Sequence, residues 1–88
     1  MGIKNIFTHL RFDKNYRKLS LKIKEKANQK EKVFREDPFY PILKTHKLSG
    51  KNKECWAFWI DYYYRVKFIF LSNEKVLFLD IGIHEIYK

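Results

Sequence analysis

The 88-residue sequence predicts an α+β fold in which an N-terminal strand and a helical hairpin precede an antiparallel sheet of three to four strands. Apolar residues recur at helical spacing in the first half of the chain and alternate in the second half. Hydrophobic residues make up 45% of the sequence, which is enough for one compact core. We therefore expect a single domain over residues 1–88, with the helices on one face of the sheet.

The start of the chain contains a short strand followed by a helix. Residues 3–8 are rich in apolar side chains and are predicted to form the strand. Phe12, Tyr16 and Leu19 then follow at helical spacing, with basic residues between them. This pattern predicts a first amphipathic helix, which directly follows the strand.

A second helix is predicted from about Leu21 to Glu36. Ser20 precedes it and is a preferred N-cap residue. Asp37 and Pro38 end it, because proline disfavours the helical conformation in the residue before it. The apolar stripe of this helix consists of Ile23, Ala27, Val33 and Phe34.

The second half of the chain is predicted to be rich in strands. Residues 38–50 contain two prolines and a glycine, which argues against a long regular element there. Strands follow at about 54–61, 63–71 and 75–81, in alternating patterns separated by turn residues. Arg65 alternates with apolar neighbours and is expected on the exposed face of the sheet. The expected core residues of these strands are Trp56, Phe58, Val66, Phe68, Leu77 and Leu79.

The formal net charge of +9 predicts an acidic partner, which is nucleic acid, an anionic membrane surface or an acidic protein. The sign of the charge does not choose among these partners, and a solvated basic surface is the plain alternative. The single cysteine, Cys55, fits a reducing compartment. No apolar run is long enough to span a bilayer, and no histidine has zinc-ligand spacing with Cys55. We expect a cytoplasmic protein without metal or cofactor.

Three sequence blocks occur in a specific order: Leu-Lys-Thr-His-Lys-Leu-Ser-Gly at 43–50, Asp-Tyr-Tyr-Tyr-Arg at 61–65 and Asp-Ile-Gly-Ile-His at 80–84. Together they resemble the RelE/ParE superfamily of toxins from type II toxin–antitoxin systems, most closely its RelE/StbE- or YafQ-like mRNA interferases. The resemblance covers nearly the whole chain. It implies a RelE-like fold and a ribosome-dependent endonuclease that an antitoxin holds inactive. The alternatives within the superfamily are a ParE-like inhibitor of DNA gyrase without catalysis and an inactive relative that still binds antitoxin.

Metal-free cleavage of RNA requires a base for the ribose 2′-hydroxyl, a cation for the charged phosphorane and an acid for the leaving 5′-oxygen. The resemblance implies that His84, Arg65, His46 and Tyr87 are the catalytic residues. In the family, the residue matching Arg65 contacts the scissile phosphate. The residues alone leave other interpretations open: His84 is a surface histidine near the C-terminus, His46 is a loop histidine bonded to the backbone, and Arg65 is paired with Asp61 or Asp80 for structure.

Basic and aromatic residues near these positions form the expected RNA-binding set, which consists of Lys44, Lys47, Lys51, Lys53, Lys67 and Trp59. RelE carries lysines on the second strand that assist catalysis, and the corresponding positions here hold Ala57 and Trp59, which puts the acid–base assignment in question. Trp59 has the alternative role of a surface that the antitoxin covers. The expected partners are mRNA, the ribosome and a small acidic antitoxin, which forms a toxin–antitoxin hetero-oligomer with this chain.

Overall fold

A computed structural model of the chain describes residues 2–83 and residue 86. The first half holds β1 (Asn5–Thr8), α1 (Leu10–Arg17) and α2 (Leu21–Glu36). The second half holds four further strands and two short 3₁₀ helices: η1 (Pro41–Leu43), β2 (His46–Lys47), η2 (Gly50–Asn52), β3 (Trp56–Trp59), β4 (Tyr64–Phe70) and β5 (Lys75–Ile83). The predicted α+β order is confirmed.

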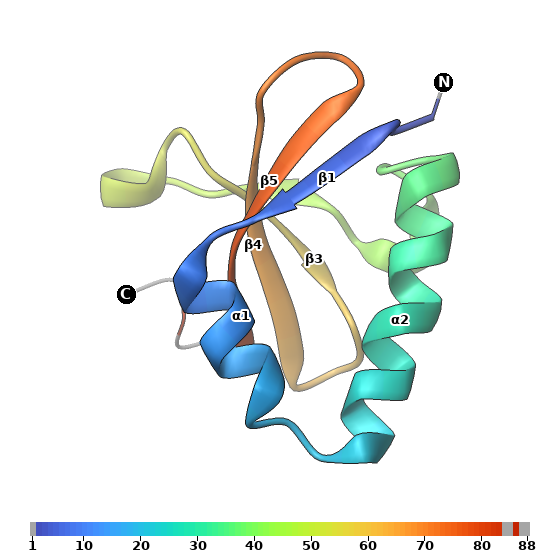
Figure 1. The fold of residues 1–88 in the computed structure, drawn as a ribbon. Coiled ribbons are helices and arrows are strands. Elements are labelled where there is room, and N and C mark those ends of the chain that lie inside the picture. The colour runs from blue at the N-terminus through green and yellow to red at the C-terminus, as the bar shows by residue number, and fades with distance from the viewer. Residues whose placement is uncertain (1, 84–85, 87–88) are drawn as a thin grey trace.

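The strands form one five-stranded sheet in the order β1-β5-β4-β3-β2. Strands β2 to β5 pair antiparallel, as predicted. Strand β1 adds a parallel edge, with Asn5 opposite Lys75 and Thr8 opposite Phe78 (Figure 1). The sheet is therefore mixed and larger than predicted. Its short strand β2 was not predicted, because two residues are too few to show alternation.

Helix α2 begins and ends where the sequence predicts. The side-chain oxygen of Ser20 accepts a hydrogen bond of 3.3 Å from the backbone N–H of Ile23, which satisfies one of the free donors at the start of the helix. The helix ends at Glu36, and Asp37 adopts an extended conformation before Pro38. Two local sequence signals thus fix both ends of the longer helix.

The core lies between the helices and one face of the sheet. The ring of Phe34, from α2, lies 4.8 Å from that of Phe58 and 5.0 Å from that of Phe68, measured between centroids. Phe12, from α1, lies 5.3 Å from Phe78 on β5. Both helices therefore cover the same face of the sheet. The opposite face of β2, β3 and β4 carries His46 and Lys67.

The predicted core positions on β5 are wrong by one residue. Val76 and Phe78 are buried in the core, whereas Leu77 and Leu79 are half-buried on the opposite face. Phe68 pairs with Phe78 and the preceding Lys67 pairs with Asp80, so Leu79 is the extra residue of a β-bulge. Both faces of β5 carry apolar residues, and for this reason alternation did not reveal which face is buried.

The remaining predicted core positions fit the structure. Phe58, Val66 and Phe68 are buried. Trp56 is half-buried at the margin of the core, where its ring lies 5.6 Å from that of Phe70. The segment between α2 and β3 contains no long regular element, and fully buried Leu43 anchors it to the core.

Candidate nucleic-acid interface

A row of paired residues crosses the sheet on the face away from the helices. His46 pairs with Ala57, Ala57 with Lys67, and Lys67 with Asp80. Directly opposite residues in an antiparallel sheet point to the same face. Because Phe58 belongs to the core, its neighbour Ala57 and the paired residues His46 and Lys67 face away from it. The sheet thus brings His46 and Lys67 onto one surface, as the two predicted roles require.

A second row lies beside the first and contains Trp59, Arg65 and Gly82. The guanidinium carbon of Arg65 lies 3.9 Å from the centre of the Trp59 ring. Its Nη1 donates hydrogen bonds to the carbonyl oxygens of Asp61 at 2.7 Å and Tyr64 at 3.3 Å. Arg65 lies on the expected face, but it is only 7% exposed because Trp59 covers it. The predicted face is therefore correct, although the Arg65 side chain is buried on it.

Lys44 approaches Trp59 from the segment before β3, and His46 follows close behind it on β2. The Lys44 ammonium lies 5.4 Å from the centre of the Trp59 ring, within the range of a cation–π interaction. Lys44 adopts a left-handed conformation with φ of 49°, and its carbonyl oxygen lies 2.9 Å from Nδ1 of His46. Because a carbonyl oxygen only accepts, Nδ1 is the donor in this contact. Lys44, His46 and Trp59 therefore form one cluster.

The acidic residue of the first row is directed into the protein. Asp80 is 7% exposed, and its Oδ1 accepts hydrogen bonds from Nδ2 of Asn15 at 2.7 Å and from the N–H of Ile81 at 2.8 Å. Asp80 also lines a shallow hollow next to Lys67 and Arg11. Among the described residues, the outward-facing charge beside the row is thus cationic, which suits phosphate binding. The sequence did not single out Arg11, because it lies far from Lys67 along the chain.

Asp61 shapes the turn that follows this cluster. Its Oδ1 accepts hydrogen bonds from the N–H groups of Tyr63 at 2.9 Å and Tyr64 at 2.8 Å, and its Oδ2 lies 3.3 Å from Nζ of Lys26. Partial burial acts to raise the pKa of Asp61. The N–H groups of Tyr64 and Tyr63 and the ammonium of Lys26 act against it, and together they lower the pKa below its ordinary value. Asp61 is therefore firmly ionised near neutral pH.

Comparison with solved structures gives close matches in fold. The YoeB/ParE toxin from Agrobacterium tumefaciens matches with a TM-score of 0.78 and 18% identity, over 92% of this chain and 99% of that one. The RelBE2 toxin–antitoxin complex from Mycobacterium tuberculosis matches with a TM-score of 0.77 and 10% identity, over 96% of this chain and 100% of that one. YafQ from E. coli matches with a TM-score of 0.68 and 15% identity, over 92% of this chain and 93% of that one. The chain has the RelE-like toxin fold. No protein-family model and no curated protein matches the sequence.

Other predicted residues of this RelE-like chain lie apart from the cluster. Lys47 follows His46 on β2, so its side chain points to the opposite face, where its ammonium lies 6.0 Å from the centre of the Trp56 ring. Lys51 and Lys53 are exposed on the η2 loop, which projects away from the sheet (Figure 1). Their predicted role in binding stays untested.

Two of the four predicted catalytic residues, His84 and Tyr87, lie outside the described residues. His84 follows directly on Ile83, the last residue of β5, which pairs with Tyr64. The other two, Arg65 and His46, lie on the sheet face described above. The role of all four stays a prediction.

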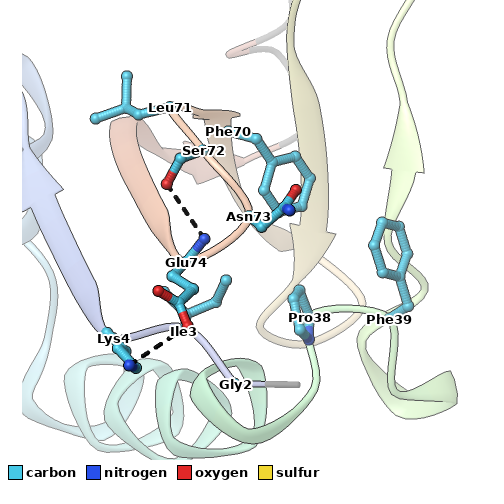
Figure 2. A pocket seen from close by; sticks show the side chains of 10 residues that line it. All are labelled: Gly2, Ile3, Lys4, Pro38, Phe39, Phe70, Leu71, Ser72, Asn73 and Glu74. Atoms are coloured by element: carbon cyan, nitrogen blue, oxygen red, sulfur yellow. Dashed lines mark hydrogen bonds and ion pairs between the residues drawn. The ribbon is translucent and has the colours of Figure 1, made fainter.

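A wide, mostly apolar hollow lies at the other end of β4 (Figure 2). Phe39, Phe70 and Leu71 line it, and a 3.5 Å ion pair between Lys4 and Glu74 lies at its margin. None of the predicted catalytic residues lines this hollow, so we place the candidate site on the sheet face. In the part of the chain that the structure describes, no three His, Cys, Asp or Glu side chains are grouped to hold a metal ion. No described helix has the length and apolar character needed to cross a membrane.

Proposed function

We propose that the protein is the toxin of a type II toxin–antitoxin system and that it cuts mRNA on the ribosome in the cytoplasm. The RelE-like fold supports the toxin role, since the similar structures are toxins of this kind. The observation that carries the nuclease role is the sheet face on which His46, Arg65 and Lys67 share two adjacent rows. This face combines a titratable group with cations, which a surface used only for binding does not require.

The proposed reaction is metal-independent cleavage of the RNA backbone. A base removes the proton of a ribose 2′-hydroxyl, and the oxygen attacks the adjacent phosphorus. The bond from phosphorus to the 5′-oxygen then breaks, and an acid protonates that oxygen. His46, His84 and Tyr87 are the proposed proton-transfer groups. Lys67 is the proposed cation beside the phosphate, where it stabilises the negative charge of the phosphorane.

In this proposal Arg65 does not contact the scissile phosphate directly, although the resemblance of its sequence block implies that it does. Its guanidinium is covered by Trp59 and engaged by two carbonyl oxygens. It therefore holds Trp59 and the following turn in position, and it reaches a phosphate only when Trp59 swings away. The exposed lysines, Lys44 among them, make the first contact with the RNA backbone.

The proposed antitoxin is a small acidic protein that binds the basic surface of the toxin. The net charge of +9 favours such a partner and makes the association fast at low salt. Two of the structurally similar proteins were solved as complexes with antitoxins, RelB and YefM. Weak binding of the cognate antitoxin at low ionic strength contradicts this part of the proposal.

The experiment that tests the proposed function runs two assays on one preparation. The first measures cleavage of an mRNA during translation, and the second measures supercoiling by DNA gyrase. We expect cuts in the mRNA and no effect on gyrase. His84→Ala is expected to abolish the cuts, whereas Lys32→Ala, an exposed change on α2, leaves them unchanged. Inhibition of gyrase without RNA cuts contradicts the proposal and indicates a ParE-like inhibitor.

A further inference from the structure

The turn between β3 and β4 is held by many hydrogen bonds. The N–H of Ile60 donates to the carbonyl oxygen of Tyr64 at 2.9 Å, which closes the turn. The Asp61 carboxylate accepts from the N–H groups of Tyr63 and Tyr64, and the Asp61 carbonyl accepts from Arg65. The backbone of this four-residue connection is thus fixed from within.

Helix α2 fixes the same turn from outside. Nζ of Lys30 donates to the carbonyl oxygen of Ile60 at 3.0 Å, and Nζ of Lys26 lies 3.3 Å from Oδ2 of Asp61. Figure 1 shows the connection between β3 and β4 beside this helix. Two lysine side chains lose rotamer freedom to make these contacts, which costs free energy. The turn is therefore held more firmly than a simple connection requires.

This fixed turn displays two tyrosines to solvent. Tyr62 is 69% exposed and Tyr63 is 65% exposed, so neither contributes much to the core. Their ring centroids lie 5.1 Å apart with planes at 88°, and the Tyr62 ring lies 5.9 Å from that of Trp59. Aromatic surfaces that are already ordered bind a ligand at a lower entropic cost. The two tyrosines and Trp59 thus form a preorganised aromatic surface on which a flat, apolar group can pack.

The charges around the rings indicate what kind of ligand carries that flat group. The ammonium of Lys44 lies over Trp59, and Lys26 lies beside the turn with 40% of its side chain exposed. The acidic residue of the turn, Asp61, already accepts two backbone N–H groups and pairs with Lys26. The surface therefore favours an anion with aromatic groups, a description that fits single-stranded RNA.

We propose that Tyr62 and Tyr63 form a stacking site for unpaired RNA bases, with Lys44 attracting the adjoining phosphates. This inference rests on the proposed function and deepens it, since it names the surface that binds nucleotides beside the reacting one. Stacking tolerates every base, because each base has an aromatic face. A protein partner also uses exposed tyrosines, and the test below separates it from RNA.

The test measures binding of a labelled eight-nucleotide single-stranded RNA to the full chain by fluorescence anisotropy. Tyr62→Ala and Tyr63→Ala are each expected to weaken binding by roughly 5-fold to 150-fold, the range for loss of one stacked base. Tyr62→Phe and Tyr63→Phe keep the rings and are expected to bind as the parent does. Phe39→Ala, a control with a ring that is 50% exposed at the other end of β4, is expected to leave binding unchanged.

An abasic oligonucleotide of the same length separates stacking from charge. It keeps the phosphates but lacks the bases, so the parent and the alanine variants are expected to bind it equally. If the parent does not bind the eight-nucleotide RNA, or the alanine variants bind it as the parent does, the inference is wrong. An equal loss on both ligands also overturns it, because the tyrosines then act through folding or charge.

Two further readouts complete the test. If the alanine variants lose affinity for the antitoxin and not for RNA, the surface is a protein interface and the inference is wrong. Binding of free oligonucleotide is independent of cleavage on the ribosome. If the protein binds the oligonucleotide through the tyrosines but cuts no mRNA, the proposed function is contradicted and the stacking site is still supported.

Discussion

Trp59 covers Arg65: the guanidinium carbon lies 3.9 Å from the centre of the indole ring, and Nη1 is bonded to the carbonyl oxygen of Asp61. The contact joins β3 to β4 at the start of the turn that carries the exposed tyrosines. A buried cation with aromatic and carbonyl partners contributes to stability as well as to chemistry. An Arg65 variant therefore loses activity either because the fold is less stable or because a catalytic contact is missing. Stability measurements separate these two causes.

Arg65→Ala is expected to lower the free energy of unfolding by about 2 to 3 kcal/mol, since a hydrogen bond to a charged group and a cation–π contact are lost together. Urea denaturation followed by circular dichroism measures the change. Arg35→Ala is the matched control, because Arg35 makes an exposed ion pair with Glu31 at 3.1 Å. We expect the control to shift the free energy by less than about 0.5 kcal/mol. Equal effects of the two changes contradict the structural role of Arg65.

Asp61 is expected to make the stability of the fold depend on pH. Its pKa is lower in the folded chain than in the unfolded one, so the unfolded state binds a proton more readily as the pH falls. The stabilising contribution is therefore complete at neutral pH. It decreases below the ordinary carboxyl range of about 4 and is lost as the pH falls through the folded pKa. Asp61→Asn removes this contribution, so the stabilities of variant and parent should differ at pH 7 and converge in acid.

The pH experiment requires a control carboxylate. Glu74 forms an exposed ion pair with Lys4 at 3.5 Å, and the side chains are 54% and 72% exposed. Exposed pairs contribute little to stability, so the difference between Glu74→Gln and the parent should stay small at every pH. A stability difference for Asp61→Asn that does not change between pH 7 and pH 2 is the result that disproves the ionic role of Asp61.

Phe34 is one of the largest fully buried side chains of the core. It is fully buried and contacts the rings of Phe58, Phe68 and Phe78. Phe34→Ala is expected to cost about 3 to 5 kcal/mol, through lost burial and the cavity left behind. Thermal unfolding should show a large decrease in Tm, and a smaller one for Phe34→Leu. Phe7→Ala, at a ring that is 49% exposed on β1, serves as the control with little effect.

Local signals in the sequence predicted the elements that local physics determines. The N-cap Ser20 and the break at Pro38 set the bounds of α2, and alternation located β3 and β4. The core face of β5 was not predictable in this way. Leu77 and Leu79 are as apolar as their buried neighbours, and only the bulge in the pairing of β4 with β5 shows why they face outward.

The candidate site was predictable in part. Periodicity placed Arg65 on the correct face of the sheet, but its burial depends on Trp59, six residues earlier and on another strand. Such cross-strand contacts are set by register, which a single sequence does not reveal. The turn tyrosines also carry no periodic signal. The turn that displays them is ordered by the hydrogen bonds of Asp61, which only the folded backbone brings together.

His46 is the catalytic candidate whose place on the sheet can be tested most directly. It is exposed on the row that contains Lys67, and its Nδ1 donates to the Lys44 carbonyl. His46→Ala is expected to reduce cleavage of translated mRNA by about 10²- to 10⁴-fold, the usual contribution of a positioned acid or base. His46→Asn keeps an N–H donor near the Lys44 carbonyl but transfers no proton near neutral pH. It should therefore reduce cleavage as strongly as His46→Ala does.

Lys32→Ala, the exposed change on α2, is the control for that measurement. Lys32 belongs to neither of the two rows that contain His46, Lys67 and Arg65. The control should therefore fold and cut mRNA as the parent does. If His46→Asn keeps full cleavage while His46→Ala loses it, His46 acts by holding the Lys44 segment in place. The proton transfers then belong to other groups, with His84 as the first to test.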